Sequence, residues 1–253
     1  MSTTAAIVLA GGRSSRMGTA KAALEWHGST LLRRVAGIVG RAAGPVVVVR
    51  APGQELPALP AEVRVVDDAR EGRGPLQGLL AGLEALDRAA EVVYVSSVDA
   101  PLLGPPFVRR VLAAVGPDAD AAVPRGAGRH HPLAAAYRTT VRPVVARLIA
   151  ADRRRMEDLL AALRVTWLDV GEPEGLRNLN EPADYAAARA LPPPPVRVAL
   201  DGTVRPARAA TLAAAAPGLD LARLSVALNG EPVGADPELP LAAGDVVELV
   251  RRG

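Results

Sequence analysis

Short runs of apolar and β-branched residues alternate, through most of the chain, with stretches in which apolar residues recur at helical spacing. The runs predict strands at residues 5–9, 46–50, 63–66, 92–96, 121–123, 133–137 and 165–169. The stretches between them predict helices at 31–43, 76–89, 106–115, 141–150, 156–163 and 183–191. Strands that alternate with helices are typical of parallel sheets with crossover helices, so we expect an α/β fold with a Rossmann-like open, mostly parallel sheet.

Four consecutive prolines at positions 192–195 interrupt this pattern. Such a run forms a stiff, extended spacer, because proline ends a helix and offers no amide hydrogen to a sheet. The sequence therefore predicts one domain over residues 1–191, a proline linker at 192–195 and a second, smaller domain over 196–253. Predicted strands at 196–200, 202–206, 224–228 and 246–250, with a helix at 211–216, would give the second domain a small mixed sheet.

Composition narrows the functional classes. Of the 253 residues, 49% are hydrophobic and 23% are charged, which is typical of a packed globular protein. The chain has 0 cysteines, which excludes catalytic thiols, disulfides and zinc–thiolate sites. The net charge of +3 and the 2% of aromatic residues argue against a nucleic-acid partner. No apolar run is long enough to cross a bilayer, so we expect no membrane partner and a cytoplasmic protein.

A glycine-rich loop follows the first predicted strand. It reads Leu-Ala-Gly-Gly-Arg-Ser-Ser-Arg-Met-Gly from Leu9 to Gly18, and Lys21, the only lysine of the chain, comes soon after it. Glycines let backbone amides approach a phosphate, and Arg13, Arg16 and Lys21 would add positive charge. The loop therefore predicts an anion-binding nest at the carboxyl end of a strand, where open α/β sheets bind ligands. A Gly-Gly turn with solvent-facing arginines is the alternative interpretation.

Asp99 is the second candidate, because it comes directly after an apolar predicted strand. A carboxylate at the carboxyl end of a strand, opposite a phosphate nest, is well placed to hold a hard divalent cation that also binds triphosphate oxygens. We expect that cation to be Mg²⁺. The alternative is an Asp-Ala-Pro turn in which Asp99 caps the next segment.

These two features belong to a series of motifs that stand in order along residues 5–190. The series comprises the loop from Leu9 to Lys21, Gly-Pro-Leu-Gln-Gly at 74–78, Asp-Ala-Pro at 99–101, His-Pro-Leu-Ala-Ala at 131–135 and Asn-Leu-Asn-Glu-Pro at 178–182. Together they resemble the molybdenum cofactor guanylyltransferases, within the wider group of sugar-nucleotide-type nucleotidyltransferases. The first motif belongs to the wider group, whereas the last two point to the molybdopterin branch.

The resemblance implies a role for each matched residue. Residues near the ends of the first strands would bind the nucleotide: Leu9, Ala10, Gly11, Gly12, Arg13, Lys21, Asp68 and Asp99. Catalysis would depend on Lys21, Arg16 and Asp99. Lys21 and Arg16 would neutralise phosphate charge, and Asp99 would bind Mg²⁺ as the metal ligand. The molybdopterin would lie near His131, Asn178 and Asn180.

Two basic clusters leave their roles open. His130 and His131 could form a metal pair, but neighbours in a strand face opposite ways, so a structural or substrate-contacting role for His131 is favoured. The run Arg153-Arg154-Arg155 could hold an anionic pterin phosphate, or it could be a solvated surface.

The tail carries a Val-Ala-Leu-Asn-Gly strand and turn at 226–230 and a Gly-Asp-Val-Val start of a last strand at 244–247. Both resemble the small sulfur-carrier proteins of molybdopterin and thiamine biosynthesis, which have the ubiquitin-like β-grasp fold. The resemblance implies a β-grasp domain that could meet other proteins of molybdenum cofactor biosynthesis. Those carriers end in Gly-Gly, whereas this sequence ends in Arg252 and Gly253, so we expect a structural or docking role rather than sulfur transfer.

These observations predict a two-domain enzyme that transfers GMP from MgGTP to the terminal phosphate of molybdopterin and releases pyrophosphate. Because the phosphate and metal candidates all precede the proline linker, we expect residues 1–191 to transfer the nucleotide without the tail. Two alternatives stay open. One is a nucleotidyltransferase that uses CTP or another phosphate acceptor, and the other is a degenerate nucleotide-binding protein that displays a ubiquitin-like module to partners.

Overall fold

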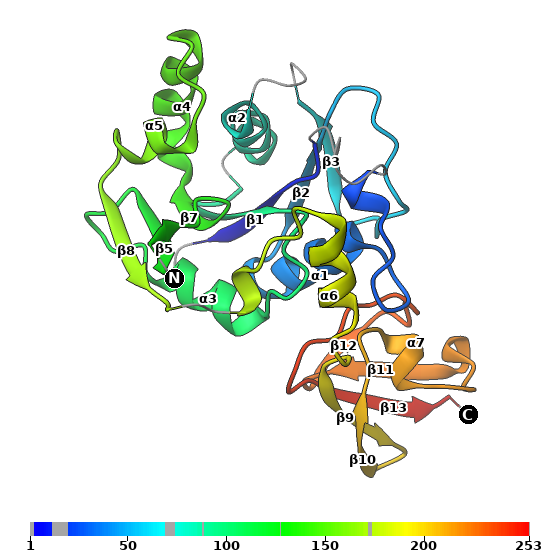
Figure 1. The fold of residues 1–253 in the computed structure, drawn as a ribbon. Helices are drawn as coiled ribbons and strands as arrows, with labels where there is room; N and C mark the ends of the chain where they lie inside the picture. The colour runs from blue at the N-terminus through cyan, green and yellow to red at the C-terminus, as the bar shows by residue number, and fades with distance from the viewer. Residues whose placement is uncertain are drawn as a thin grey trace.

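The structure, a computed structural model, describes residues 3–11, 20–68, 74–87, 89–126, 128–171 and 174–252. This part of the chain forms one sheet of 8 strands before the proline run and one of 5 strands around and after it, as Figure 1 shows. Within these residues, no helix combines the length and the apolar character needed to cross a membrane.

The large sheet has the strand order β3-β2-β1-β4-β7-β5-β6, and β8 pairs with β5. β1, β2, β3 and β4 are parallel to one another, whereas β7 is antiparallel to both β4 and β5. The expected α/β architecture with a mostly parallel sheet is confirmed, and the β7 side makes the sheet mixed. The strands are β1 Thr4–Leu9, β2 Val46–Arg50, β3 Arg64–Asp67, β4 Val92–Ser97, β5 Ala121–Gly126, β6 Arg129–His130, β7 Ala134–Arg138 and β8 Val165–Asp169.

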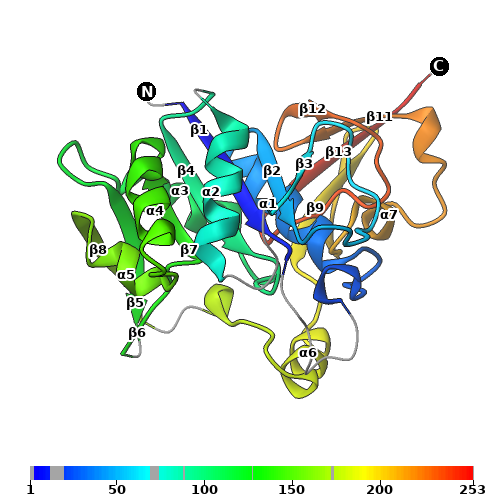
Figure 2. The ribbon, with the colours of Figure 1, turned by 90° about the horizontal axis from the view of Figure 1, so that it is seen from above.

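Helices cover both faces of the large sheet (Figures 1 and 2). Alternate residues of β1 serve the two faces, as the two-residue period of a strand requires: Val8 packs with α1, α3 and α6, while Ile7 packs with α2, α4 and α5. The α-helices are α1 Leu31–Ala43, α2 Pro75–Leu86, α3 Pro105–Ala113, α4 Arg142–Ala150, α5 Met156–Leu160 and α6 Pro182–Arg189. Short 3-10 turns are η1 Lys21–Ala23, η2 Thr139–Val141 and η3 Glu174–Leu176.

Local chemistry sets the ends of these helices. The side chain of Thr30 accepts a hydrogen bond from the amide of Arg33 and so caps α1, which ends at Gly44 with a φ of 95°. α2 is shorter than its apolar pattern predicts, because Asp87 takes a φ of 48° and turns the chain out of the helix. α2 also lies close to β1: a Cβ on Gly82 would come within 2.6 Å of Ile7 Cγ2.

The smaller sheet and its helix, which span residues 195–252, are here called the C-terminal unit. Its strand order is β10-β9-β13-β11-β12, with β13 parallel to β9 between two antiparallel hairpins. Apolar residues of the sheet, including Val198 and Val247, enclose a core of their own with Leu212 of the helix and with Leu241. The elements are β9 Pro195–Leu200, β10 Thr203–Arg208, α7 Leu212–Ala215, η4 Leu221–Arg223, β11 Leu224–Leu228, β12 Glu231–Val233 and β13 Val246–Arg251.

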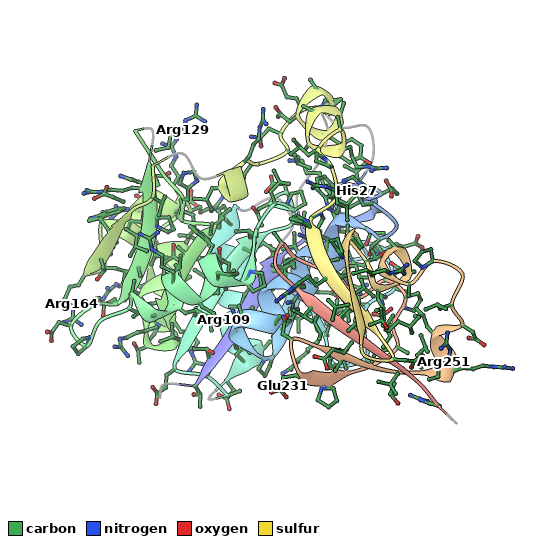
Figure 3. The ribbon with its side chains drawn as sticks, turned by 90° about the horizontal axis from the view of Figure 1, so that it is seen from below. His27, Arg109, Arg129, Arg164, Glu231 and Arg251 are labelled. Atoms are coloured by element: carbon green, nitrogen blue, oxygen red, sulfur yellow. The ribbon has the colours of Figure 1, made fainter. Side chains whose placement is uncertain are left out.

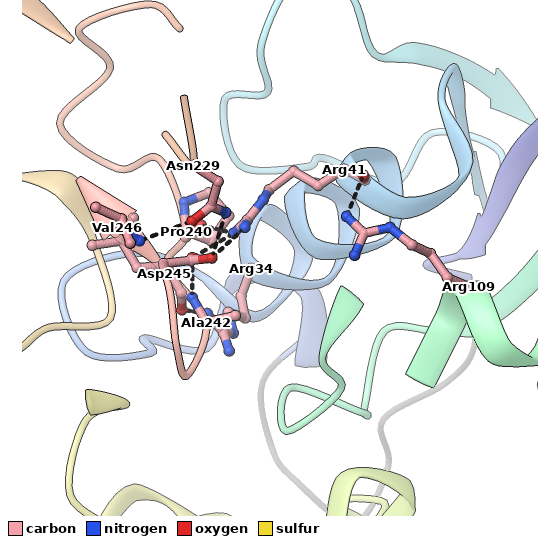
Figure 4. A network of polar contacts seen from close by, with 9 residues as sticks. Arg34, Arg41, Arg109, Asn229, Pro240, Ala242, Asp245 and Val246 are labelled. Atoms are coloured by element: carbon pink, nitrogen blue, oxygen red, sulfur yellow. Dashed lines mark hydrogen bonds and ion pairs between the residues drawn. The ribbon is translucent and has the colours of Figure 1, made fainter. Parts of the chain in front are cut away.

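The C-terminal unit docks on α1 through an ionic network centred on Asp245 (Figure 4). Both terminal nitrogens of Arg41 donate to the Asp245 carboxylate, at 2.8 and 2.6 Å, and Asn229 and the amide of Ala242 donate to it at 3.0 and 2.7 Å. Burial alone would raise the pKa of Asp245, but these hydrogen bonds outweigh burial and hold that pKa below its ordinary value. Asp245 is therefore charged and fully partnered at neutral pH.

A second ionic group lies one to two turns earlier on α1. Arg33 forms ion pairs with Asp236 and Glu238, and the hydroxyl of Ser29 donates to Glu238 at 2.9 Å. Charged residues at the outer ends of the two parts, such as Arg164 and Arg251, point away from this junction in Figure 3. The junction is thus a specific contact between the two parts of the chain.

Gly37 lies between the two ionic groups and gives the junction a steric test. A Cβ at this position would sit 2.3 Å from Cγ of Pro240, far inside van der Waals contact. Alanine is the better helix former by about 1 kcal/mol, yet overpacking a tight contact costs about 1–3 kcal/mol, so we expect Gly37→Ala to lower the free energy of unfolding. Urea denaturation measures this change.

Gly116→Ala is the matched control, because a Cβ at Gly116 meets nothing within 4 Å. It should leave stability unchanged within about 0.5 kcal/mol. A Gly37→Ala protein as stable as the parent would show that α1 and Pro240 do not pack in solution as described.

Candidate functional site

The carboxyl ends of β1 and β4 bring together two of the predicted catalytic residues. Leu9 pairs with Ser97 in the parallel register, and the carbonyl of Leu9 accepts a hydrogen bond from the amide of Val98 at 3.2 Å. Beyond these strand ends, Nζ of Lys21 lies 3.1 Å from Oδ2 of Asp99. Their side chains are 18% and 14% exposed, so the ion pair is partly shielded from water and open on one side.

Ser97 fixes the other oxygen of the carboxylate. Its hydroxyl donates a hydrogen bond to Oδ1 of Asp99. Asp99 thus has one oxygen held by a neighbour on β4 and one beside the ammonium group of Lys21. Sequence reasoning assigned Ser97 no role, because spacing along the chain does not show which way its hydroxyl points.

Two of the predicted nucleotide-binding residues, Leu9 and Asp68, lie beside Gly78 in the first turns of α2. A Cβ on Gly78 of this helix would come within 3.1 Å of the Leu9 side chain and 4.0 Å of Oδ2 of Asp68, so the three positions adjoin one another. The amide of Ala10 donates to the Val49 carbonyl at 2.8 Å, which continues the β1–β2 pairing past the strand.

Gly11 ends the described part of the loop. A Cβ there would come within 3.2 Å of the amide nitrogen of Ala51, so a glycine fits this close approach. Gly12, Arg13 and Arg16 lie outside the described residues, and their assignment to the phosphate nest stays a prediction.

The late Asn-Leu-Asn motif reaches the same site through its backbone. The amide of Leu179 donates to the carbonyl of Asp99 at 2.9 Å, and the Leu179 side chain is fully buried. Asn178 and Asn180, on either side of it, are exposed. The structure therefore brings both asparagines next to the Asp99 loop, and their role in binding molybdopterin stays a prediction.

A cavity of about 530 Å³ opens beside this loop and contains two of the predicted molybdopterin-binding residues, His131 and Asn178. Its wall also includes Leu133, whose carbonyl accepts a hydrogen bond from the amide of Ser97 at 3.2 Å. Burial, together with the positive charge of Arg129 (labelled in Figure 3), lowers the pKa of His131. His131 is therefore neutral at pH 7 and can both donate and accept a hydrogen bond.

The arginines of the 153–155 run lie in different surroundings. Arg154 and Arg155 line the cavity, and Arg154 also forms an ion pair with Asp152, whereas Arg153 lies outside the lining and forms an ion pair with Asp158 at 2.8 Å. Nε of Arg154 is buried and has no hydrogen-bond partner in the part of the chain that the structure describes. A cavity wall with two guanidinium groups suits an anionic ligand.

A metal ion at this site would have few protein ligands. Among the described residues there is no cluster of three or more histidine, aspartate or glutamate side chains that could hold a metal, and the ring of His130 packs on that of Trp167 at 4.4 Å. Asp99 nevertheless suits Mg²⁺, which usually takes one or two carboxylates and fills its other positions with water and substrate phosphate oxygens. The donor set fits a cation that arrives with a nucleotide.

Comparison with known proteins assigns the family. The family model of the MobA-like NTP transferase domain matches residues 6–166. The chain belongs to this family. A probable molybdenum cofactor guanylyltransferase of Mycobacterium tuberculosis (strain ATCC 25618 / H37Rv) is 39% identical over 187 residues, which cover 72% of this chain and 92% of that protein. The chain is therefore a nucleotidyltransferase of the MobA-like family.

Solved structures agree on the fold of this MobA-like enzyme. Molybdopterin-guanine dinucleotide biosynthesis protein A from Archaeoglobus fulgidus has 23% sequence identity and a TM-score of 0.56, over 73% of this chain and 96% of that one. A Mycobacterium tuberculosis protein solved in complex with manganese has 21% identity and a TM-score of 0.54, over 72% and 96%.

Lys21→Arg tests the Lys21–Asp99 pair. An arginine places its charge on a longer, planar fork, which does not replace a compact ammonium group aimed at phosphate oxygens. We expect kcat/KM for the nucleotide to fall by about a hundredfold, as for loss of one preorganised electrostatic contact, with little change in melting temperature. Steady-state pyrophosphate release measures the effect.

Arg197→Lys is the control for this exchange, because Arg197 is exposed on the C-terminal unit. It should leave kcat/KM unchanged. If Lys21→Arg also had parental kinetics, the ammonium group would have no specific role at the phosphates.

Proposed function

We propose that the enzyme transfers GMP from MgGTP to the terminal phosphate of molybdopterin and releases pyrophosphate. The observation that carries this proposal is the Lys21–Asp99 pair together with a cavity lined by His131, Arg154 and Asn178, which the Leu133–Ser97 hydrogen bond connects to the Asp99 loop. The pair suits a triphosphate, and the cavity suits an anionic acceptor. The printed names of the relatives, molybdenum cofactor guanylyltransferases, support the choice of GTP and molybdopterin.

The reaction needs no covalent enzyme intermediate. An oxygen of the acceptor phosphate attacks the α-phosphorus of GTP, a new P–O–P bond forms, and the bond to the β-phosphate oxygen breaks. That oxygen leaves with the bonding electrons as part of pyrophosphate. The protein's contribution is to align the two phosphates and to neutralise the charge that grows on the leaving group.

The site residues have different parts in this alignment. Lys21 places its ammonium group where phosphate oxygens of the nucleotide would lie, and Ser97 holds the Asp99 carboxylate in one orientation. Leu9 and Asp68, which meet around Gly78, would receive the nucleoside. Mg²⁺ on Asp99, when bound, would neutralise triphosphate charge. Arg13 and Arg16 would add positive charge to the same phosphates.

The cavity beside the site would bind the acceptor. Neutral His131 can hydrogen-bond a pterin, and Arg154 and Arg155 can pair with the terminal phosphate. Asn178 and Asn180 flank Leu179, whose amide donates to the carbonyl of Asp99. The same short segment would therefore contact the acceptor and hold the loop that carries Asp99.

We further propose that the chain is divided into a nucleotidyltransferase domain over residues 1–191, a proline linker at 192–195 and a β-grasp domain over 196–253. The sheet order β10-β9-β13-β11-β12, the parallel β9–β13 pair and the crossing helix α7 support the β-grasp assignment. The separate apolar core of the C-terminal unit supports the boundary. Such a domain could also contact other proteins of molybdenum cofactor biosynthesis.

A nucleotide panel tests the activity. We expect GTP, with Mg²⁺ and molybdopterin, to release pyrophosphate at least tenfold faster than CTP, ATP or UTP, and mass spectrometry should find the guanine dinucleotide product. Turnover with CTP in preference to GTP would select the alternative specificity, and no turnover with any nucleotide would favour the degenerate binding protein.

Asp99→Asn tests the proposed metal ligand. The exchange is nearly isosteric but removes the charge, so the rate of pyrophosphate release should fall by about a hundredfold or more.

Arg154→Gln tests the acceptor site. Loss of one charge-assisted hydrogen bond costs about 1.5–3 kcal/mol, so the KM for molybdopterin should rise about tenfold or more. The KM for GTP should stay unchanged. Arg153→Gln is the matched control, because both arginines have a carboxylate partner, Asp152 for Arg154 and Asp158 for Arg153, but only Arg154 lines the cavity. It should leave both KM values as they are. Equal effects of the two substitutions would place the acceptor elsewhere.

A further inference from the structure

Arg34 of α1 is a buried charge that the reaction described above does not use. It is 6% exposed, and burial lowers its pKa to about 10. The guanidinium group therefore remains charged at neutral pH inside the protein. A buried charge is costly unless hydrogen bonds compensate for it, so its partners are informative.

The partners of Arg34 are two backbone carbonyls from opposite sides of the junction. Nε donates to the carbonyl of Pro101 at 3.0 Å, and Nη1 donates to the carbonyl of Leu241 in the C-terminal unit. Within the described residues, no carboxylate forms an ion pair with Arg34, because nearby Asp245 is engaged by Arg41 (Figure 4). The guanidinium group thus bridges two loops instead of neutralising an acid.

Pro101 belongs to the loop that carries the proposed metal ligand. The backbone of this loop is held at Asp99 by the amide of Leu179 and, two residues later, at Pro101 by Arg34. Between these two points, Ala100 is buried in the same apolar core as Ala242 of the C-terminal unit. Loss of the Leu179–Asp99 or the Arg34–Pro101 hydrogen bond would leave one end of the 99–101 segment without its backbone contact.

We propose that Arg34 is a positioning residue for Asp99, and that the C-terminal unit takes part in nucleotidyl transfer by holding Arg34 in place through Leu241. This inference rests on the proposed function, because it concerns the same metal-binding loop. It replaces the expectation that residues 1–191 transfer the nucleotide equally well without the tail.

The alternative is that Arg34 only fastens the two parts of the chain together. Arg41 separates the two interpretations. It lies on the same helix and contacts the same unit, through Asp245 and the Pro240 carbonyl, but among the described residues its side chain forms no hydrogen bond with the Asp99 loop. A fastening role predicts similar effects of substitution at both arginines, whereas a positioning role predicts an effect on the metal-binding loop at Arg34 alone.

The experiment compares Arg34→Met with Arg41→Met in the full chain. Methionine keeps an unbranched apolar stem but donates no hydrogen bond to Pro101. Because loss of a group that orients a metal ligand typically costs about 10–100-fold in metal affinity or activity, we expect Arg34→Met to raise the Mg²⁺ concentration for half-maximal rate about tenfold or more and to lower kcat. Arg41→Met should lower the melting temperature but leave the Mg²⁺ dependence at the parental value.

Hydrogen–deuterium exchange of the metal-free proteins gives a readout that does not depend on activity. The amides of Val98 and Leu103 are hydrogen-bonded at the two ends of the loop. Their exchange should be faster in Arg34→Met than in the parent, and unchanged in Arg41→Met. A parental Mg²⁺ dependence and parental exchange in folded Arg34→Met would overturn the inference.

A lysine pair covers the case in which Arg34→Met does not fold. Arg34→Lys keeps the charge but can no longer span both carbonyls with a rigid fork, so its Mg²⁺ dependence should lie between those of the parent and Arg34→Met. Arg41→Lys should match the parent, and equal behaviour of the two lysine variants would overturn the inference. If the parent itself releases no pyrophosphate from GTP, the proposed function fails instead, and faster exchange in Arg34→Met would still show that Arg34 holds the loop.

Discussion

The parallel pairing of β1 with β4 is the constraint on which the site depends. Its register sets Leu9 beside Ser97, so the glycine-rich loop and the Asp99 loop leave the sheet at one edge. Lys21 and Asp99, far apart in sequence, can then form an ion pair at 3.1 Å. A shift of the β1–β4 register by one residue would exchange the side chains that β1 presents to the two layers of helices. Because each layer packs its own set of β1 side chains in an apolar core, such a shift is disfavoured.

Burial of charge is the second constraint, and it explains why the two parts of the chain meet at α1. Arg34 and Asp245 both lie in the junction. Arg34 donates to one carbonyl from each part of the chain, and Asp245 accepts from Arg41 of α1 and from Asn229 and Ala242 of its own unit. Separation of the parts would remove the Leu241 carbonyl from Arg34 and with it the contact that holds Arg34 beside Pro101. The junction is thus polar, specific and connected directly to the loop that carries Asp99.

Much of the fold was predictable because parallel strands buried on both faces are read as continuous apolar runs, such as β2 Val46–Arg50. β6 and β12 were not predicted, because strands of two or three residues leave no period to detect. Within the site, the motifs named His131 and Asn178, which line one cavity, and Asp99, whose loop adjoins it, while the roles of the three residues stay predictions. The roles of Arg154 and Ser97 depend on which way side chains point across the sheet edge, and sequence spacing does not contain that information.

The junction face of α1 shows why sequence reasoning gave the tail no part in the reaction. Arg34, Gly37 and Arg41 recur at three- and four-residue spacing, which places them on one side of a helix. Charged residues with a glycine between them are ordinarily read as a solvated face. In this structure Pro240 packs against Gly37 at a distance that a Cβ would prevent. Arg34 and Arg41, on either side of Gly37, donate hydrogen bonds to backbone carbonyls and to the Asp245 carboxylate instead of to water. The charge pattern of a helix therefore identifies a face but not what covers it, and in this chain Arg34 connects the covering element to the Asp99 loop.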